Sequence, residues 1–274
     1  MLNSVDINGR AYRIDPSPID ISIPLRFDGP QPNAYGVPPA SSMPCAAGEL
    51  VGDTREGGSC NFEEYTLIPH CNGTHTECVG HITRERISVR DCLEDVFIPA
   101  LLITAAPSYA SDTGEKYSIP IDAADRLITK QVLEAAVAAA DKPVPYRQVA
   151  LIIRTLPNDD RKLTRQYVDE IPPYFTTAAM EFIAECGFKH LLVDLPSIDR
   201  LYDEGKLSNH RIFWSVDQGS YATDQKTRLG STITEFIFVP NRIEDGAYVL
   251  NLQIAPFASD ASPSRPVLFR VEKN

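Results

Sequence analysis

Two short apolar runs decide the fold: residues 149–153 have the sequence VALII, and residues 190–195 have the sequence HLLVDL. A continuous apolar run of this length is typical of a strand that is covered on both faces. Between the two runs, Thr176 or Thr177 can start a helix that Gly187 ends. A strand, a helix and a strand at this spacing predict a crossover that joins two parallel, neighbouring strands.

The sequence before this crossover predicts a second helix and an edge strand. Thr129 can cap a helix that continues to Ala140 and ends at residues 141–143, with Leu133 placed for a hydrophobic staple. Residues 19–25 alternate between apolar and other side chains, as in a strand with one buried face. Pro24 places that strand at the edge of a sheet or at a strand end, because proline cannot donate a backbone hydrogen bond.

Two more strands are predicted near the C-terminus, at residues 248–254 and 267–271. We find neither an internal repeat nor a linker. The sequence therefore predicts an α/β fold in which residues 1–274 form a single domain with a mixed β-sheet flanked by helices. Residues 1–45 are expected to form an extended N-terminal strand and arm.

Composition and charge exclude several functions. Hydrophobic residues make up 43% of the 274-residue chain and charged residues 23%, as in an ordinary globular protein. The net charge of −11 argues against nucleic-acid binding, which needs clustered Lys and Arg side chains. The sequence MLNSVD at the N-terminus lacks the features of a signal peptide, and no apolar run approaches the about 20 residues of a membrane helix. We therefore expect no membrane association and a cytoplasmic location.

The cysteines fit that location. No CxxC pair occurs, so reduced thiols are the simpler interpretation. The six cysteines are Cys45, Cys60, Cys71, Cys78, Cys92 and Cys186.

Chemistry is concentrated in residues 70–81, which have the sequence HCNGTHTECVGH and hold three of the five histidines. Imidazole and carboxylate groups suit zinc or manganese, and His75 and Glu77 would point the same way in extended chain. The alternative is a polar loop whose histidines only form hydrogen bonds, but the clustering favours metal binding or catalysis. Cys78 could act as a nucleophile, but a buried structural cysteine is the more common case.

The same segment resembles the H-x-G-T-H-x-D-x-x-x-H signature of the cyclase family, which includes bacterial kynurenine formamidase and isatin hydrolase. Residues 20–25 (DISIPL) resemble the family's D-L-S-x-P-L, and residues 194–199 (DLPSID) resemble its D-T-P-S-x-D. The resemblance implies the swivelling β/β/α-type fold of that family and a homodimer or higher homo-oligomer.

The resemblance also implies roles for individual residues. His75 and Glu77 match metal ligands, and His81 matches the catalytic histidine. His210 and Glu235 match the later metal-binding His and Glu. Independently of the family, Glu235 lies at strand spacing between two isoleucines, where a buried carboxylate needs a cation or hydrogen bonds. The alternative is an edge strand with Glu235 in solvent.

Two departures from the signature affect the ligand set. Where the family has its first metal-binding His, this chain has Cys71, and His70 lies one residue further away. Either His70 reaches the metal through a longer loop or the Cys71 thiolate binds it. The second departure is Glu77 in place of Asp, which adds a methylene group.

The predicted function is hydrolysis of a C–N amide bond in a small molecule, either an N-formyl arylamine such as N-formylkynurenine or a cyclic amide. A divalent metal, zinc first and manganese second, would be the cofactor, and His81 the general acid and base. Two alternatives remain: a ligand-binding relative without catalysis, and a lactone hydrolase or dehydratase that uses the same metal site. Pocket walls are expected among four aromatic residues that can equally be core: Tyr35, Phe62, Tyr65 and Trp214.

Overall fold

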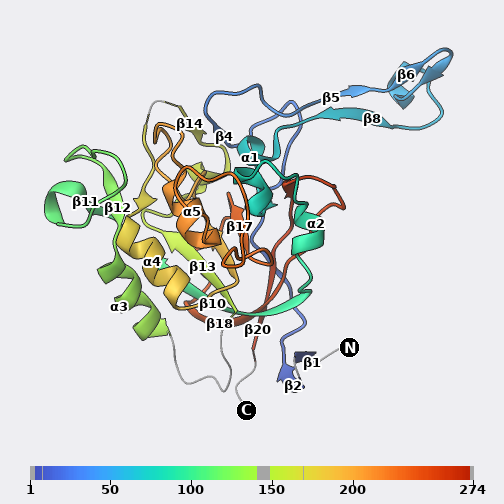
Figure 1. Cartoon of the computed structure of the whole chain (residues 1–274). Helices are drawn as coiled ribbons and strands as arrows, with labels where there is room; N and C mark the ends of the chain where they lie inside the picture. Colours follow the sequence, from blue (N-terminus) through green and yellow to red (C-terminus); the bar gives the residue numbers. More distant parts are fainter. Residues whose placement is uncertain (1–3, 8, 141–148, 169, 272–274) are drawn as a thin grey trace.

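The computed structural model describes residues 4–7, 9–140, 149–168 and 170–271. A nine-stranded mixed sheet forms its centre (Figure 1). From one edge to the other, the strands are β19 (Ala261–Pro263), β9 (His75–Glu77), β17 (Thr232–Glu235), β16 (His190–Val193), β13 (Ala150–Thr155), β10 (Phe97–Ala105), β18 (Gly246–Asn251), β20 (Val267–Arg270) and β3 (Ile19–Asp20).

The four middle strands β17, β16, β13 and β10 are parallel to one another, and the strands directly beside them, β9 and β18, are antiparallel to them. The predicted crossover is confirmed: β13 and β16 pair in parallel, with Leu151 opposite Leu191 and Ile153 opposite Val193. All residues of both strands are buried, as the two apolar runs predicted. The expected α/β fold with a mixed sheet is therefore confirmed.

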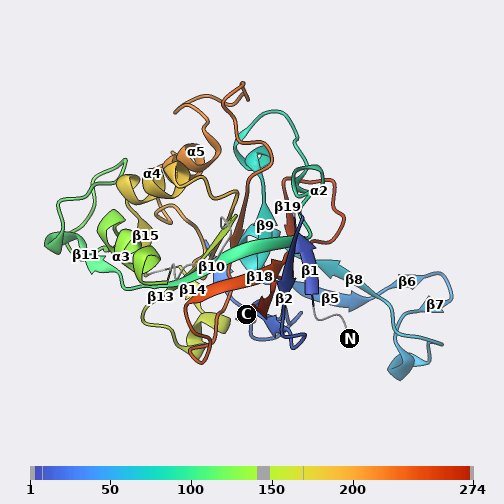
Figure 2. The ribbon, with the colours of Figure 1, turned by 90° about the horizontal axis from the view of Figure 1, so that it is seen from below.

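Three helices cover one face of the sheet: α3 (Lys130–Ala140), α4 (Thr177–Glu185) and α5 (Ser208–Trp214) (Figure 2). Alternate strand residues face them, including Leu101, Ile153 and Val193, and pack with Met180 of α4 and Phe213 of α5. The predicted caps are present. The Thr129 hydroxyl accepts a hydrogen bond from Val132 N at 3.2 Å, and the Thr176 hydroxyl, rather than that of Thr177, accepts one from Ala179 N.

The other face of the sheet is covered by chain without long helices. Ile19, Ile21, Ile243 and Leu252 pack there against Leu102 and its neighbours. Residues 19–25 keep the predicted alternation of burial, but only Ile19–Asp20 form a strand, at the sheet edge, because the chain then turns toward residue 237. The strand predicted at 248–254 lies at Gly246–Asn251 instead, and residues 141–143, predicted to end α3, lie outside the described residues.

A long hairpin extends away from the body (Figure 1). Its stem pairs β5 (Ser41–Pro44) with β8 (Glu63–Thr66), and its tip pairs β6 (Ala46–Ala47) with β7 (Leu50–Val51) beside η1 (Thr54–Glu56). We call residues 41–66 the arm. Large apolar side chains of the arm are exposed, among them Met43, Leu50 and Tyr65.

The remaining elements are short. They are β1 (Ser4–Ile7) with β2 (Arg10–Arg13), β4 (Asn33–Ala34) with β14 (Gln166–Tyr167), the sheet of β11 (Ser108–Tyr109), β12 (Arg126–Ile128) and β15 (Tyr174–Phe175), the helices α1 (Pro69–Asn72) and α2 (Val89–Cys92), and the 3-10 turns η2 (Val79–Ile82), η3 (Ala110–Asp112) and η4 (Asp160–Leu163).

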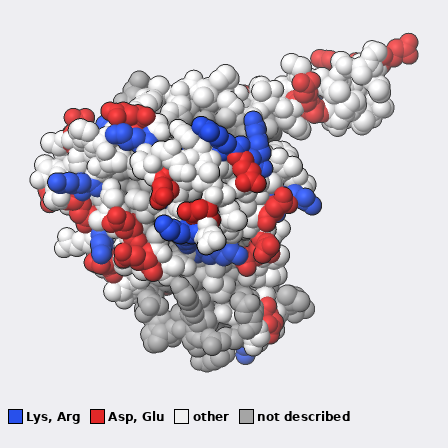
Figure 3. Space-filling view, viewed as in Figure 1, with Lys and Arg blue, Asp and Glu red and all other residues white. Residues whose placement is uncertain are grey.

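Across the described part of the chain, no helix is both long and apolar enough to cross a membrane. Basic and acidic side chains are interspersed on the face in Figure 3.

Candidate active site

Strand pairing brings three predicted site residues together. β9 pairs antiparallel with β17, which places His75 directly opposite Glu235. Opposite residues project from the same face of a sheet, and Glu77 shares that face because it lies two residues from His75. Thr76 and Thr234 project from the other face, where their hydroxyl oxygens lie 2.8 Å apart. The alternative of a solvent-exposed Glu235 on an edge strand is wrong, because β17 lies inside the sheet and Glu235 is buried.

Helix α5 adds His210 to this face. His210 Nε2 lies 2.9 Å from Glu77 Oε1, and His210 Nδ1 lies 2.5 Å from Asp199 Oδ2. The other Asp199 oxygen accepts hydrogen bonds from the Tyr117 hydroxyl at 2.5 Å and from Asn209 N at 2.8 Å. Asp199 therefore fixes both the start of α5 and the orientation of the His210 ring.

The chain that follows β16 also positions Glu235. Ile198 N donates a hydrogen bond to Glu235 Oε1 at 2.8 Å. Residues 194–199 thus hold one carboxylate and one imidazole of the site through main-chain and side-chain contacts. Asp199 lies in the segment that resembles a family motif, but the sequence alone assigned it no role.

The structure brings His70 rather than Cys71 to these residues. His70 Nε2 lies 3.4 Å from Glu77 Oε2, while Cys71 packs in an apolar cluster with Ile23 and Phe236. Burial, followed by the nearby Glu235 carboxylate, raises the pKa of Cys71 to about 11. His70 and Cys71 both lie in the single helical turn α1, where successive side chains project about 100° apart, so only one of the two faces the site.

His81 and Asp260 complete the group. His81 stacks on His70 with ring centroids 4.5 Å apart, and its Nδ1 lies 3.7 Å from Glu77 Oε2. Asp260 Oδ2 lies 3.1 Å from His70 Nε2 and 3.4 Å from His81 Nδ1. Asp260 was missed in the sequence because it stands alone in SDASPS, far along the chain from the other site residues.

We call these seven residues the histidine cluster: His70, His75, Glu77, His81, His210, Glu235 and Asp260. His70, His81 and Asp260 each expose about a quarter of their side chains, and the other four residues are buried. A substrate can therefore reach the cluster from the side of His70, His81 and Asp260. Two subsets, each with ligand atoms within 4.8 Å of one another, can hold a metal ion: His70, Glu77 and His81; and Glu77, His210 and Glu235.

Charges in the cluster depend strongly on one another. Burial would raise the pKa of Glu77, but the imidazoles of His81, His210 and His70 outweigh burial and hold that pKa well below its usual range. Burial and the Glu77 charge raise the pKa of Glu235 well above its usual value. Burial opposes protonation of His210, yet Glu77 and Asp199 raise its pKa well above the usual value. In the absence of a metal, protons compensate the buried carboxylates.

His75 shows that a cation fits this site. Burial and the nearby His70 lower the pKa of His75 to about 4, so its imidazole is neutral near pH 7. Its Nδ1 lies 3.0 Å from the carbonyl oxygen of Gly73, which can only accept, so Nδ1 carries the proton. The unprotonated Nε2 has no hydrogen-bond partner among the described residues and lies 3.6 Å from Glu235 Oε2. When Glu235 is ionised, two acceptors face each other in a buried site, and such a pair fits a cation.

Other residues singled out in the sequence lie outside the histidine cluster. Cys78 is fully buried and donates from Sγ to Ile87 O at 3.4 Å, and its hydrogen bond with Cys92, together with burial, raises its pKa. It therefore lacks the thiolate that a nucleophile needs.

Trp214 is buried with its ring 5.4 Å from that of His210. The other three aromatic residues predicted as pocket walls, Tyr35, Phe62 and Tyr65, are exposed.

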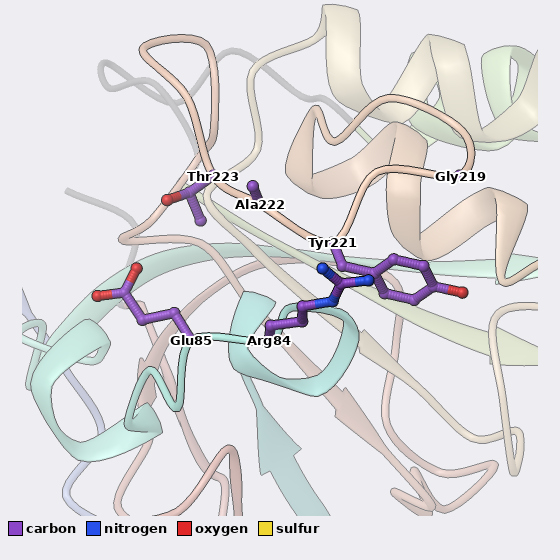
Figure 4. A pocket seen from close by; sticks show the side chains of 6 residues that line it. All are labelled: Arg84, Glu85, Gly219, Tyr221, Ala222 and Thr223. Atoms are coloured by element: carbon purple, nitrogen blue, oxygen red, sulfur yellow. The ribbon is translucent and has the colours of Figure 1, made fainter.

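A surface hollow of about 450 Å³ lies beside the segment that follows His81 (Figure 4). Arg84 N donates to Tyr221 O at 2.9 Å, and the Arg84 guanidinium lies over the Tyr221 ring, 5.5 Å from its centroid. No residue of the histidine cluster lines this hollow, so we assign it no part in the chemistry. The lining residues are Arg84, Glu85, Gly219, Tyr221, Ala222 and Thr223.

The fold and the histidine cluster define a class: an α/β protein with a buried histidine–carboxylate site at the carboxyl ends of its parallel strands, where ligand sites of such sheets lie. Residues 19–200, more than half of the chain, match the model of the Cyclase family, which is described as "Putative cyclase". The chain belongs to this family.

Individual relatives agree with that assignment. The chain is 24% identical over 257 residues to a kynurenine formamidase of Bacillus cereus, a match that covers 91% of this chain and 96% of that protein. Its fold is similar to isatin hydrolase A from Labrenzia aggregata, with a TM-score of 0.60 and 15% identity over 93% of this chain and 94% of that one. Isatin hydrolase A from Ralstonia solanacearum gives a TM-score of 0.59 at 15% identity, over 93% and 92% of the two chains.

The prediction of an enzyme of the cyclase family is thereby confirmed at the level of the family, since relatives that match nine tenths of the chain are enzymes. The resemblance noted from residues 70–81 is confirmed as well.

Proposed function

We propose that the protein is a metal-dependent hydrolase of a C–N amide bond, in an N-formyl arylamine or a cyclic amide. The observation that carries the proposal is the buried pair of His75 Nε2 and Glu235 Oε2, which lie 3.6 Å apart and, with Glu235 ionised, would both serve as metal ligands. The names of the kynurenine formamidase and isatin hydrolase relatives support an amide substrate of this kind.

The residues that would hold the metal are His70, His75, Glu77, His210 and Glu235. Zinc is the first candidate and manganese the second, because imidazole and carboxylate groups are ligands of both. A bound divalent ion would polarise the substrate carbonyl and lower the pKa of water toward neutrality. The geometry favours His70 over Cys71 in this ligand set, since the Cys71 thiol packs among apolar side chains.

His81 would move the proton. It is partly exposed and lies beside Glu77, so it can reach both the site and an incoming substrate. It would take a proton from the attacking water and return that proton to the leaving nitrogen.

The first test combines metal content with turnover. The purified protein is stripped with a chelator, reconstituted with zinc or manganese, and analysed for bound metal by elemental analysis. It is then assayed with N-formylkynurenine, isatin and a lactone. Stoichiometric metal and turnover of either amide support the proposal. A protein that binds no metal and turns over none of the three is a ligand-binding relative, and turnover of the lactone alone indicates the other chemistry.

The second test is His81→Ala. We expect the zinc content to stay unchanged and kcat to fall by about 10²–10⁴-fold, the usual size of a general acid–base contribution. His190→Gln is the matched control, because His190 is the one histidine outside the cluster and contacts Thr232 and Asp95 instead. The control is expected to keep its turnover once its folding has been verified. Unchanged turnover in His81→Ala, with metal bound, contradicts the assigned role.

A cytoplasmic homodimer or higher homo-oligomer is part of the proposal. The arm supports it, because Met43, Leu50 and Tyr65 expose apolar surface on a hairpin that extends from the body. Light scattering on a size-exclusion column measures the oligomeric state directly. A monomer at micromolar concentration contradicts this part of the proposal and leaves the chemistry unaffected.

A further inference from the structure

Asp260 lies beside His81, although no sequence motif includes it. One of its oxygens, Oδ2, lies 3.4 Å from His81 Nδ1. The other oxygen, Oδ1, accepts a hydrogen bond from the Ser259 hydroxyl at 3.1 Å. The carboxylate is therefore oriented, with one oxygen held by its neighbour and the other directed toward the imidazole.

The main chain fixes Asp260 in this place. Cys78 N donates to Asp260 O at 3.0 Å, directly after Glu77, and Ala261 is the β19 partner of Glu77. Val89 N donates to Ser259 O at 2.8 Å. These contacts tie the Asp260 backbone to the strand that carries His75 and Glu77, so the sheet itself sets the position of the side chain.

Two carboxylates face His81 Nδ1, and they differ in what else they contact. Glu77 Oε2 is 3.7 Å away, but Glu77 is buried and belongs to both subsets that can hold a metal. Asp260 belongs to neither subset and is partly exposed. If Glu77 is a metal ligand, Asp260 is the carboxylate that remains available to His81. His70 Nε2, 3.1 Å from Asp260 Oδ2, is likewise engaged when it binds the metal.

We propose that Asp260 is a positioning residue for His81: its carboxylate accepts a hydrogen bond from His81 Nδ1–H and so presents the unprotonated Nε2 to the reactants. A carboxylate that binds one imidazole nitrogen fixes which nitrogen carries the proton. His81 Nε2 then takes a proton from water as the water oxygen attacks the amide carbon. The same proton passes to the nitrogen as the C–N bond breaks, and Asp260 stays ionised throughout. The proposal rests on the proposed function, in which His81 carries the proton.

An NMR measurement that does not require turnover tests which nitrogen of His81 carries the proton. Protein labelled with 15N-histidine and loaded with zinc is compared with Asp260→Ala by nitrogen–proton correlation spectra in mildly alkaline buffer, with His81→Gln used to assign the His81 signals. We expect His81 to carry its proton on Nδ1 in the wild-type protein and to lose this preference in Asp260→Ala. The same His81 tautomer in both proteins overturns the proposal.

Kinetics test the consequence. In Asp260→Ala we expect kcat to fall by about 10–100-fold, the usual effect of removing the carboxylate partner of a functional histidine. KM and zinc content are expected to be unchanged, because a positioning residue acts through His81 and not on the metal or the substrate. Added acetate should restore part of kcat, since the site of Asp260 is open to solvent, whereas chloride at the same ionic strength should not. Asp260→Glu should retain more kcat than Asp260→Ala.

The matched control is Asp91→Ala, which removes the same charge from the exposed surface of α2 and should leave kcat unchanged. Loss of zinc from Asp260→Ala would make Asp260 a ligand and overturn the positioning role, as would a loss of kcat that acetate does not restore. If the wild-type protein turns over none of the three substrates, the proposed function fails, and the tautomer comparison still decides the role of Asp260.

Discussion

Two buried polar clusters lie at the carboxyl ends of neighbouring parallel strands, and they differ in how completely their groups are paired. The first, which we call the lysine cluster, consists of Thr155, Asn158, Lys162 and Asp194. Lys162 Nζ donates to Thr155 O and to Asp194 Oδ2, each at 2.7 Å, and Asp194 accepts from Thr155 N and its hydroxyl as well. One cation and one anion are matched, and the ammonium group is surrounded by acceptors.

The histidine cluster lacks this balance. Glu77 and Glu235 are buried close together, and His75 Nε2 has no hydrogen-bond partner among the described residues. Unpaired buried polar groups cost stability, so proteins retain them where they bind something. The lysine cluster therefore stabilises the loop after β13, whereas the histidine cluster is arranged for an ion that completes it.

Disruption of the lysine cluster should change the free energy of unfolding the most. Lys162→Met should lower the free energy of unfolding by about 3–5 kcal/mol, because Asp194 is left as an unpaired buried charge. Urea denaturation of the metal-free protein measures this loss. Lys130→Met is the control, since the Lys130 side chain is partly exposed and lies 3.8 Å from the Glu134 carboxylate, too far for a strong ion pair. A loss no greater than that of the control would mean that the lysine cluster is not structural.

The next effect concerns completion of the histidine cluster. Zinc at about 100 times its dissociation constant should raise the free energy of unfolding by about 2.7 kcal/mol. In Lys162→Met, provided that it folds, zinc should raise the free energy of unfolding by the same amount. In His75→Ala, the same zinc concentration should raise it by much less. Denaturation of each protein with and without zinc measures the increments. Equal increments in His75→Ala and wild type would exclude His75 from the ligand set.

A smaller effect should appear without metal. The pKa of Glu235 is raised above its ordinary value of 4.5, so the folded protein binds this proton more tightly than the unfolded chain does. Its contribution is complete below pH 4.5 and is lost as the pH rises through the folded-state pKa. Metal-free Glu235→Gln should therefore be more stable than wild type near neutral pH.

Denaturation of Glu235→Gln and wild type across a pH series measures this difference in the free energy of unfolding. The advantage of Glu235→Gln should grow as the pH rises and should vanish in acid. A variant that is less stable than wild type at neutral pH without metal would show that Glu235 is already well compensated by the protein.

The smallest effect separates the two faces of β9. Thr76→Val removes one hydroxyl of the pair with Thr234, on the face opposite His75, and should cost about 1 kcal/mol. Zinc should raise the free energy of unfolding of Thr76→Val by the same amount as that of wild type. A reduced increment would mean that the hydroxyl pair helps to set the geometry of the site.

Periodicity predicted the middle of the sheet well because both β13 and β16 are buried on two faces and their sequences are largely apolar. The Thr129 and Thr176 caps were readable for a similar reason, since a cap is a local hydrogen bond. The strand at 19–25 was predicted too long, because alternation reports burial and not the presence of a pairing partner.

The site was predictable where its residues lie close together in sequence. His75 and Glu77 share a face by strand geometry, and the resemblance brought in His210 and Glu235. The choice between His70 and Cys71 depended on the turn of α1, which the sequence alone did not settle. Asp199 and Asp260 were not assigned roles, because their proximity to the histidines arises from the packing of α5 and β19.

The position of β9 has a consequence for folding order. This three-residue strand pairs on one side with β17 and on the other with β19, both far along the chain, as the 158-residue separation of Thr76 and Thr234 shows. Contacts between such distant residues close large loops and form late. During synthesis, the segment with the most histidines is made before both of its partner strands, so it cannot take its place in the sheet until residues 232–263 have emerged. Until then, these histidines lack the carboxylates of Glu235 and Asp260 that lie beside them in the folded protein.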